Sequence, residues 1–526
     1  MLEPAATYYA PGGMVCTVDH LASAAGVAVL RAGGNAVDAA IATGAVLTVT
    51  FQHRNGLGGD LLAVVVPPGE APVAINSSGF AGSGANAAAA RAEGLTRIPA
   101  RNDIRAVTVP GCVDGWLALH ERFGRLPLAE VLAAARDYAA EGFPVGPELA
   151  GEIHLIAERP GAADFIAGGP AHAGSRVRRP GVARLFEAII SDGREGFYGG
   201  EFGRELLEVG NGEFTPEDLT RPIAKWAPAL GVEAFGHRLW TVPPASCGYL
   251  TLASAWIASQ LDLPEDPEDP RWAHLLVEAS RQASFDRLDV LHEEADGEAL
   301  LSPERLAPRA AAIDPERASE LPGSYLKGGT IALTAVDSDR MAVSMLQSNA
   351  WGFGSYLALP RLGVFLHNRG IGFSLDEGHP NEYRPGRRPV HTLCPTAVTG
   401  LDGSLTGVVA SMGGDSQPQI VLQLLARWLH CGQEPGDALA AGRFILADPV
   451  AGAPFDTWQE RGRVEVALEG QAAEGWDEGL AGRGHDVARR TPFNASFGHA
   501  HLIALEEGML AGGTDPRPRS GGALGY

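Results

Sequence analysis

The sequence predicts an α/β or α+β protein whose chain changes character near residues 329/330. Segments with helical and with strand-like patterns of apolar residues alternate along the chain. Residues 302–328 are polar, contain proline and end in LPGSYLKGG, which is typical of an exposed linker. After this linker, residues 330–336 and 342–346 alternate like two paired strands joined by a turn at SDR.

Four segments before the linker predict individual elements. Residues 21–45 carry small apolar residues at helical spacing, interrupted by GGN, and predict two packed helices around a glycine turn. A glycine-rich loop at 54–60, RNGLGGD, precedes the strand LLAVVVPP. Residues 109–124 predict a turn that enters an amphipathic helix, and residues 273–293 predict another helix.

Length and composition favour an acidic globular protein. With 526 residues, the chain can form two or three ordinary domains or one large layered domain. Its 68 glycines and 37 prolines indicate many tight loops. A formal net charge of −22 disfavours nucleic acid and anionic membranes as partners, so we expect a small-molecule substrate.

The cysteines and the N-terminal segment point to a cytoplasmic protein. Five widely spaced cysteines without a CxxC motif indicate neither a disulfide framework nor a zinc site, so we expect buried free thiols. The chain starts without a basic segment followed by an apolar core, and no apolar run approaches the ~20 residues that span a bilayer.

Thr330 is the first residue of a strand that follows two glycines. A threonine hydroxyl is a weak nucleophile unless a base lies beside it. If the bond between Gly329 and Thr330 were cut, the new α-amine, with a pKa of about 7.7–8, would be that base. From this segment alone, an ordinary strand threonine after a glycine turn is the simpler interpretation.

Several blocks, in order, change that interpretation. They are LASAAG and GGNAVDAA near the start, PGCVDGW at 110–116, VPPASCGY at 242–249, TIALTAVD at 330–337, RRPVHTLCPT at 387–396, SMGGDSQPQ at 411–419 and TDPRPRSGGALGY at the end. With these blocks the chain resembles the γ-glutamyltransferase (γ-glutamyltranspeptidase) family over nearly its whole length. In that family the nucleophilic threonine opens the small subunit.

The resemblance implies the four-layer αββα sandwich of the N-terminal-nucleophile hydrolases. It also implies a precursor that cleaves itself between Gly329 and Thr330. The products would be a large subunit, residues 1–329, and a small subunit, residues 330–526, which form a tight heterodimer within one intertwined domain. Whether this heterodimer dimerises further is left open.

Catalytic roles follow from the same resemblance. Thr330 would attack an amide carbonyl and form an acyl-enzyme, with its own α-amine as base and later acid. The backbone N–H groups of Gly413 and Gly414 would form the oxyanion hole, where one donor is typically worth ~3 kcal/mol. A purely structural turn is the alternative for this glycine pair. Ser348 matches the position whose hydroxyl binds the nucleophile. This chemistry needs no metal or cofactor.

The residues that read the glutamyl group in this family differ here. Ser78 stands where the large subunit has an arginine. In HNRGIGF, Arg369 replaces a Glu or Gln and Gly372 replaces an Asp. His391 and Thr392 replace a pair of serines.

These departures predict a different acyl group. An ammonium group needs an acceptor beside it, and Gly372 removes the family's carboxylate. The planar guanidinium of Arg369 suits a carboxylate instead. We therefore expect a short diacid monoamide without an α-amine, such as a glutaryl or oxamyl amide, as in the cephalosporin-acylase and oxamate-amidohydrolase branch. The alternative is that Arg369 merely pairs with Asp376 or Glu377.

Three further residues are candidates for the pocket. Asn349 adjoins Ala350, which replaces an asparagine of the family. Arg54 lies in the glycine-rich loop, which lacks the spacing of a nucleotide-binding motif. His499 is a further candidate for the cavity lining, but a satisfied structural histidine is the favoured interpretation.

Two other functions stay open at this stage. One is a genuine γ-glutamyltransferase or glutathione hydrolase, active in glutathione metabolism. The other is a non-catalytic binding protein of the same family. The retained Thr330 and Ser348 argue against the binding protein, and Ser78 and Gly372 argue against the transferase.

Overall fold

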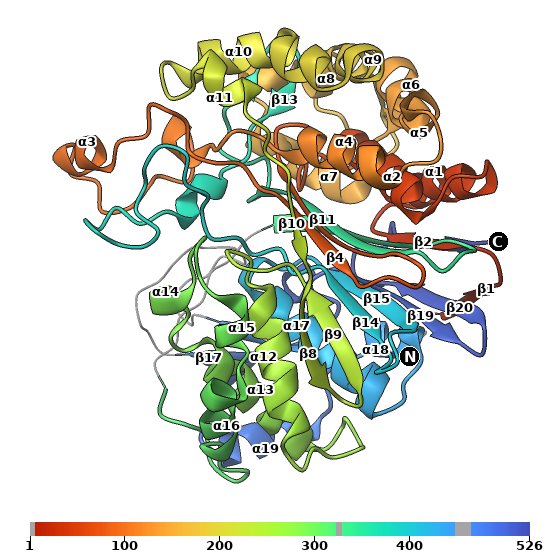
Figure 1. The fold of residues 1–526 in the computed structure, drawn as a ribbon, viewed down its shortest axis with the longest axis vertical. Helices are drawn as coiled ribbons and strands as arrows, with labels where there is room; N and C mark the ends of the chain where they lie inside the picture. The colour runs from red at the N-terminus through yellow and green to blue at the C-terminus, as the bar shows by residue number, and fades with distance from the viewer. Residues whose placement is uncertain (1–5, 322–328, 448–463) are drawn as a thin grey trace.

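Two seven-stranded antiparallel sheets pack face to face, and helices cover the outer face of each sheet (Figure 1). The computed structural model describes residues 6–321, 329–447 and 464–526. This architecture confirms the predicted four-layer αββα sandwich. Apolar side chains from both sheets, among them Leu62, Leu346 and Ile503, fill the layer between them.

The first sheet contains the predicted hairpin. Its strands, in order, are β21 (Gly522–Gly525), β2 (Met14–Thr17), β10 (Gly329–Val336), β11 (Ala342–Ala350), β3 (Asp60–Val66), β4 (Val73–Ser77) and β7 (Lys225–Pro228). β10 pairs with β2 on one side and with β11 on the other. Strands from before and after residue 329 therefore pair with one another within one sheet.

The second sheet is built in the same way. Its strands, in order, are β1 (Tyr8–Ala10), β20 (Met509–Thr514), β19 (Ala500–Glu506), β15 (Leu405–Ser411), β14 (Thr396–Thr399), β9 (His237–Thr241) and β8 (Leu230–Ala234). β8 and β9 precede residue 329, whereas β14 and β15 follow it. β14 pairs with β9, so this sheet also joins the two parts of the chain.

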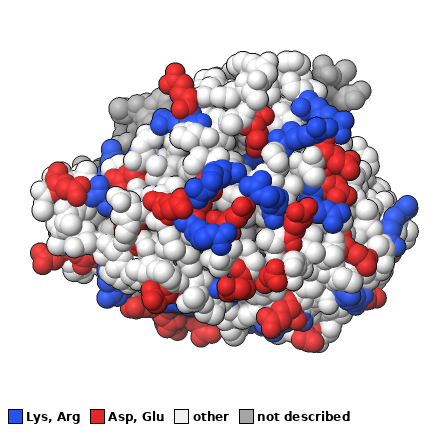
Figure 2. All heavy atoms as spheres, turned by 90° about the horizontal axis from the view of Figure 1, so that it is seen from above, with Lys and Arg blue, Asp and Glu red and all other residues white. Residues whose placement is uncertain are grey.

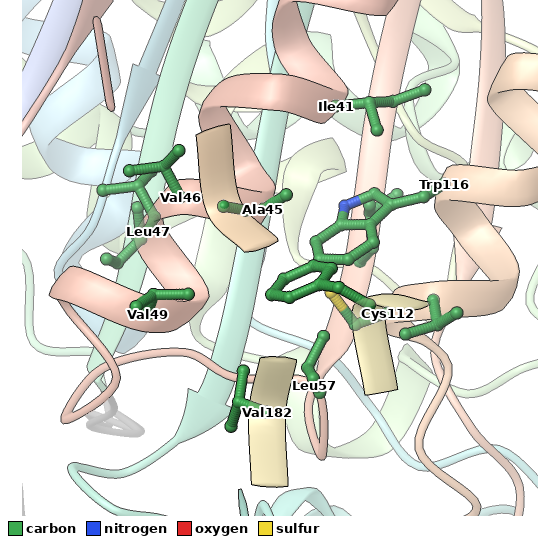
Figure 3. Close-up of a cluster of buried hydrophobic side chains, with 14 of the residues drawn as sticks. Ile41, Ala45, Val46, Leu47, Val49, Leu57, Cys112, Trp116 and Val182 are labelled. Atoms are coloured by element: carbon green, nitrogen blue, oxygen red, sulfur yellow. The ribbon is translucent and has the colours of Figure 1, made fainter. Parts of the chain in front are cut away.

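Helices over the first sheet include the predicted pair. They are α1 (His20–Arg31), α2 (Ala36–Thr50), α4 (Cys112–Phe123), α6 (Ala133–Glu141), α9 (Pro180–Arg194) and α10 (Glu201–Gly210). Asn35 and Asp38 form a capping box at the start of α2, every residue of which is buried. Figure 3 shows Ala45 of α2 pointing toward Trp116 of α4, with Leu57 of the glycine-rich loop in the same buried cluster.

Helices over the second sheet include α12 (Gly248–Ser259), α13 (Pro270–Ser284), α17 (Gln417–Leu425), α18 (Pro435–Ala440) and α19 (Gly475–Gly482). The helix predicted at 273–293 is too long, because α13 ends at Ser284 and a short helix, α14 (Arg287–Val290), follows. The chain turns at Asp286, whose carboxylate accepts hydrogen bonds from Arg305 and Arg309.

The linker predicted at 302–328 is partly wrong. Residues Pro303–Ala311 form α16, with a proline at the first helical position. Leu306 and Ala310 lie four residues apart and are buried, so this helix packs against the core. Residues 322–328 lie outside the described part of the chain.

The remaining elements are short. The helices are α3 (Ala87–Ala92), α5 (Leu128–Val131), α7 (Pro147–Glu152), α8 (Ala163–Ile166), α11 (Pro216–Thr220) and α15 (Gly297–Leu300). The strands are β5 (Phe143–Pro144), β6 (Arg176–Val177), β12 (Ala358–Leu359), β13 (Val364–Phe365), β16 (Phe444–Ala447), β17 (Glu465–Leu468) and β18 (Asp486–Arg489).

On the face shown in Figure 2, acidic and basic side chains are intermingled rather than gathered by sign. Among the described residues, no helix is both long and apolar enough to cross a membrane. The five cysteines are free, and all except the half-buried Cys431 are buried.

Candidate active site

Thr330 lies at an irregular position of β10, directly opposite the end of β11. Gly329 pairs with Ala350 while Ile331 pairs with Gln347, so the register shifts at Thr330. Such a bulge redirects a side chain away from the regular alternation of a strand. The Thr330 side chain is fully buried, and its Oγ1 lies 3.2 Å from Ser348 Oγ and 3.3 Å from Gln417 Nε2.

The hydrogen bonds around Ser348 set the direction of its contact with Thr330. Ser348 Oγ accepts from the backbone N–H of Ala350 at 2.8 Å and from Arg369 Nη2 at 3.1 Å. A hydroxyl oxygen has two acceptor lone pairs and one proton. Since both lone pairs are used, Ser348 is the donor in its contact with Thr330.

Gln417 is likewise fixed in one orientation. Its Oε1 accepts from the backbone N–H of Cys394 at 3.1 Å, so its Nε2 faces Thr330. Thr330 Oγ1 therefore accepts from Gln417 and from Ser348, and its own proton is left for a base. Gln417 lies in the block SMGGDSQPQ, but no sequence pattern singled it out as a site residue.

The strand that carries Ser348 is anchored by its neighbour Gln347. Gln347 Oε1 accepts from the Trp116 indole at 2.6 Å. Its Nε2 donates to Asn55 Oδ1 at 3.0 Å and to the carbonyl of Gly44 at 3.1 Å. These bonds tie β11 to α2, α4 and the glycine-rich loop, so the buried core beneath the site holds Ser348 in place.

Gly413 and Gly414 form the turn that leads from β15 into the helix of Gln417. Both have positive φ, at 140° and 56°, where residues with a side chain are rare. A Cβ on Gly413 would lie 2.8 Å from Ile420 Cδ1. Within the described residues, neither glycine uses its N–H in a hydrogen bond. Two unused donors thus lie in the turn that precedes Gln417.

Arg369 lies beside Ser348 in a short 3₁₀ turn, Arg369–Gly372, and is only 4% exposed. Its Nη1 donates to Thr392 Oγ1 at 3.1 Å, and its Nε donates to Asp60 Oδ2 at 3.3 Å. Burial lowers the pKa of Arg369, while Asp60 opposes this shift. The alternative, a pairing with Asp376 or Glu377, is wrong, because the carboxylate that Arg369 contacts is Asp60.

Asp60 is a central residue of the site that the sequence analysis missed. His391 Nε2 donates to its Oδ2 at 3.0 Å, and His367 Nδ1 lies 3.4 Å from the same oxygen. Burial alone would raise the pKa of Asp60, but the charges and hydrogen bonds of these histidines hold it well below its usual range. Its place at the end of RNGLGGD was the available signal.

His391 and Thr392 are held in the site by contacts with Asp60 and Arg369, respectively. Burial, helped by the charge of Arg369, lowers the pKa of His391 to about 4, so the ring is neutral at pH 7. Thr392 contacts Arg369 as described above. Both predicted residues therefore lie beside Arg369 in the structure. The carboxylate of Asp60, which joins His391 to Arg369, was not predicted.

The structure shows the surroundings of Gly372 and Ser78, the two positions that depart from the glutamyl-binding pattern. A Cβ on Gly372 would lie 2.8 Å from the carbonyl oxygen of Val390, so an aspartate side chain has no space there. Ser78 directs its hydroxyl to Asn76, and its carbonyl accepts from Arg388.

Arg54 and Asn349 meet on the other side of Ser348. The backbone N–H of Asn349 donates to the carbonyl of Arg54 at 2.9 Å. The Arg54 guanidinium forms an ion pair with Glu152 at 2.6 Å. Asn349 Nδ2 donates to the carbonyl of Gln52 at 3.1 Å.

His499 is not the satisfied structural histidine that we considered. Its side chain is buried, and neither ring nitrogen has a hydrogen-bond partner within the described residues. No group of three or more His, Cys, Asp or Glu in the described ranges has the geometry of a metal site.

Comparison with known proteins gives consistent matches over the whole chain. A sequence model of the gamma-glutamyltranspeptidase family matches residues 22–526. The oxamate amidohydrolase proenzyme of Klebsiella pneumoniae is 35% identical over 98% of both chains. A glutathione hydrolase-like proenzyme of Bacillus subtilis is 34% identical over 97% of this chain and 98% of its own. The crystal structure of cephalosporin acylase from Bacillus halodurans superimposes with a TM-score of 0.90 at 31% identity and covers 100% of this chain and 98% of that chain.

Proposed function

The chain belongs to the gamma-glutamyltranspeptidase family, and from this premise we propose that it is a self-cleaving amide hydrolase whose nucleophile is Thr330. The amide it cleaves carries a carboxylate on a short acyl group. One observation carries this proposal. Thr330 Oγ1 accepts hydrogen bonds from Ser348 and Gln417 and lies one residue after Gly329, at the bond whose cleavage would supply a base.

Self-cleavage between Gly329 and Thr330 converts the precursor into subunits 1–329 and 330–526. Thr330 Oγ1 attacks the carbonyl carbon of Gly329, and the C–N bond between the two residues breaks as the α-nitrogen of Thr330 takes up the proton of the hydroxyl. Water then hydrolyses the resulting ester, which frees the carboxylate of Gly329 and restores the Thr330 hydroxyl. Each sheet contains strands from both parts that pair with one another, which keeps the subunits together after the cut. The names of both curated relatives as proenzymes support this step.

In the mature enzyme, the α-amine of Thr330 takes the proton of the hydroxyl as Oγ1 attacks the substrate amide. The N–H groups of Gly413 and Gly414 donate to the oxyanion of the tetrahedral intermediate. The amine leaves with the proton that the α-amine returns, and water hydrolyses the acyl-enzyme by the reverse sequence. Ser348 and Gln417 hold Oγ1 through the hydrogen bonds they donate.

Arg369 binds the carboxylate of the acyl group. Three of its five N–H donors serve Asp60, Thr392 and Ser348, which leaves two for a substrate. Only two successive hydrogen bonds, of 3.1 and 3.2 Å, separate Arg369 Nη2 from Thr330 Oγ1 through Ser348. A carboxylate on Arg369 therefore lies close to the carbonyl under attack, which favours an oxamyl group over the longer glutaryl group.

A genuine γ-glutamyltransferase or glutathione hydrolase is the second candidate, favoured by the name of the Bacillus subtilis relative. The α-amine of a γ-glutamyl group needs an acceptor, and position 372 has no space for the aspartate that would provide it. Asp60 is fully buried and already contacts Arg369 and His391. The site therefore suits the desamino acyl group better.

The test begins with processing. The purified protein is run on a denaturing gel, and the N-terminus of any smaller band is sequenced, with Thr330→Ala as control. A band that starts at Thr330-Ile331-Ala332 in the wild type alone supports the proposal. A single uncut chain under all conditions would contradict hydrolysis and favour the non-catalytic binding role.

Substrate choice is tested on the processed enzyme. We expect oxamate to be hydrolysed faster than the monoamide of glutaric acid, and both faster than γ-glutamyl-p-nitroanilide. Equal or faster turnover of the γ-glutamyl compound would favour the second candidate. Addition of an acceptor dipeptide measures whether an amine competes with water.

A further inference from the structure

His53, Glu148 and His499 come together from three separate segments of the chain. His53 follows α2, Glu148 lies in α7, and His499 immediately precedes β19. His53 Nε2 lies 3.7 Å from Glu148 Oε2, and His499 Nε2 lies 3.9 Å from Glu148 Oε1. The carboxylate therefore stands between two imidazoles. The proposed mechanism uses none of these three residues.

Both imidazoles are buried without a hydrogen-bond partner among the described residues. The His53 side chain is fully buried and His499 is 1% exposed. Neither ring makes a hydrogen bond within residues 6–321, 329–447 and 464–526. Burial, with the charge of Arg54, lowers the pKa of His53 to about 3 and that of His499 to about 4. At pH 7 each ring is neutral and has one nitrogen that can accept a hydrogen bond.

The cluster also carries one uncompensated negative charge. Across the described ranges, no lysine or arginine lies within ion-pair distance of Glu148. The nearby Arg54 is paired with Glu152 at 2.6 Å. The Glu148 side chain is only 22% exposed, so water screens its charge poorly. A carboxylate beside two acceptor nitrogens suits a monovalent cation that has N–H donors.

The cluster borders the proposed oxyanion hole. A Cβ on Gly413 would lie 3.7 Å from the Cα of Gly498, the residue before His499. The carbonyl of His499 accepts from the backbone N–H of Met412 at 3.0 Å. In an amide, the nitrogen that leaves is bonded to the same carbon as the oxyanion. A subsite for that nitrogen must therefore lie beside these glycines.

We propose that His53, Glu148 and His499 form a subsite that binds the leaving amine as an ammonium ion. This inference rests on the proposed function. In the overall reaction, the amide and water give a carboxylate and an ammonium product. Its nitrogen has gained the proton returned by the α-amine and one proton from water. Glu148 balances the charge of this product, and the two imidazoles accept its N–H groups. The subsite suits ammonia or a small primary amine.

The experiment uses the processed enzyme and four chloride salts at equal ionic strength. Ammonium and methylammonium carry N–H donors, whereas sodium and tetramethylammonium carry none. We expect ammonium and methylammonium to raise the Tm and to inhibit amide hydrolysis, and the other two salts to do neither. Equal effects of all four salts would overturn the proposal, because the cluster would then bind no specific cation.

Variants test whether ammonium acts at this cluster. Glu148→Gln keeps the shape of the side chain and removes its charge, and we expect the inhibition constant for ammonium to rise at least about tenfold, equivalent to about 1.4 kcal/mol. Glu465→Gln, which changes a partly buried carboxylate paired with Arg490, should leave ammonium inhibition unchanged. His53→Asn serves as a second variant if Glu148→Gln folds poorly. Unchanged ammonium inhibition in folded Glu148→Gln or His53→Asn would refute the subsite.

The outcome also separates this inference from the proposed function. Normal self-cleavage and hydrolysis without any ammonium-specific effect would refute the subsite and leave the nucleophile intact. A rise in Tm with ammonium in a protein that hydrolyses no amide would remove the role in leaving-group binding, because no amine would then be produced.

Discussion

Arg369 Nη2 donates to Ser348 Oγ at 3.1 Å, so the guanidinium that we assign to the substrate carboxylate also orients the hydroxyl beside the nucleophile. Ser348 accepts from Arg369 and from the N–H of Ala350 and can then only donate to Thr330. The proposed carboxylate site and the proposed nucleophile are thus linked through the Ser348 side chain, and we expect changes at Arg369 or Ser348 to affect both binding and catalysis.

Replacement of Ser348 by alanine should lower kcat more than it raises KM. The hydrogen bond donated by Ser348 stabilises the negative charge that develops on Thr330 Oγ1, and such a bond is worth about 1.5–3 kcal/mol, or about 10- to 100-fold in rate. Steady-state kinetics with oxamate measure this. Ser344→Ala is the matched control, because Ser344 lies on the same strand and donates to Val409 instead. An equal loss in both variants would contradict the role of Ser348.

Replacement of Arg369 by lysine should lower kcat/KM for substrates that carry a carboxylate. Lysine keeps the charge but loses the planar fork of donors, so we expect kcat/KM for oxamate to fall by about 10²-fold. An amide without a carboxylate should lose less, since only the orientation of Ser348 is affected. Competition between the two amides at one enzyme concentration gives the ratio directly. An equal fall in kcat/KM for both amides would mean that Arg369 only orients Ser348 and does not bind the substrate carboxylate.

Asp60 should contribute to stability in a pH-dependent way. Its pKa in the folded protein is depressed below the unfolded value of about 3.9. A group of this kind contributes stability that is fully present above the unfolded pKa and is lost as the pH falls through the folded pKa. The Tm of the wild type should therefore exceed that of Asp60→Asn most clearly above about pH 4. A constant difference between pH 3 and 7 would argue against this ionisation.

Buried neutral histidines should destabilise the protein under mildly acidic conditions. The pKa values of His391 and His499 are lowered to about 4 by burial, whereas an unfolded histidine titrates near 6.5. Between these values the unfolded chain binds more protons, so stability should fall as the pH drops from about 6.5 towards 4. His499→Asn should reduce this slope in thermal unfolding at stepwise pH. An unchanged slope would place the titration elsewhere.

Gly372 should resist conversion to the aspartate of the glutamyl-binding relatives. An added Cβ would lie 2.8 Å from the carbonyl oxygen of Val390, so Gly372→Ala should already lower the Tm. Gly482→Ala is the control, since a Cβ there meets nothing within 4 Å. We expect Gly372→Asp to gain no activity on γ-glutamyl-p-nitroanilide. Such activity in a stable variant would show that the backbone around Val390 can move to accommodate the aspartate side chain.

The sequence by itself determined the fold class, the paired strands after Thr330 and the neighbourhood of Ser348, Arg369 and His391. These features depend on local sequence patterns and on the order of the matched motifs along the chain, both of which can be read from the sequence. It also indicated the helix pair at 21–45 correctly. It placed the end of the helix at 273–293 beyond Ser284 and missed the helix that begins at Pro303, because Asp286 and the buried Leu306 act through tertiary contacts.

Only the tertiary structure decided which carboxylate Arg369 contacts and which way Ser348 donates. Asp60 and Arg369 are 309 residues apart in the chain and meet because the segment before Arg369 pairs with the glycine-rich loop, through a bridge between Leu366 and Gly58. His53, Glu148 and His499 likewise meet only in the fold, where two buried imidazoles have no hydrogen-bond partner among the described residues. Sequence patterns report each residue's own element, whereas hydrogen-bond direction and charge balance depend on which elements the fold brings together.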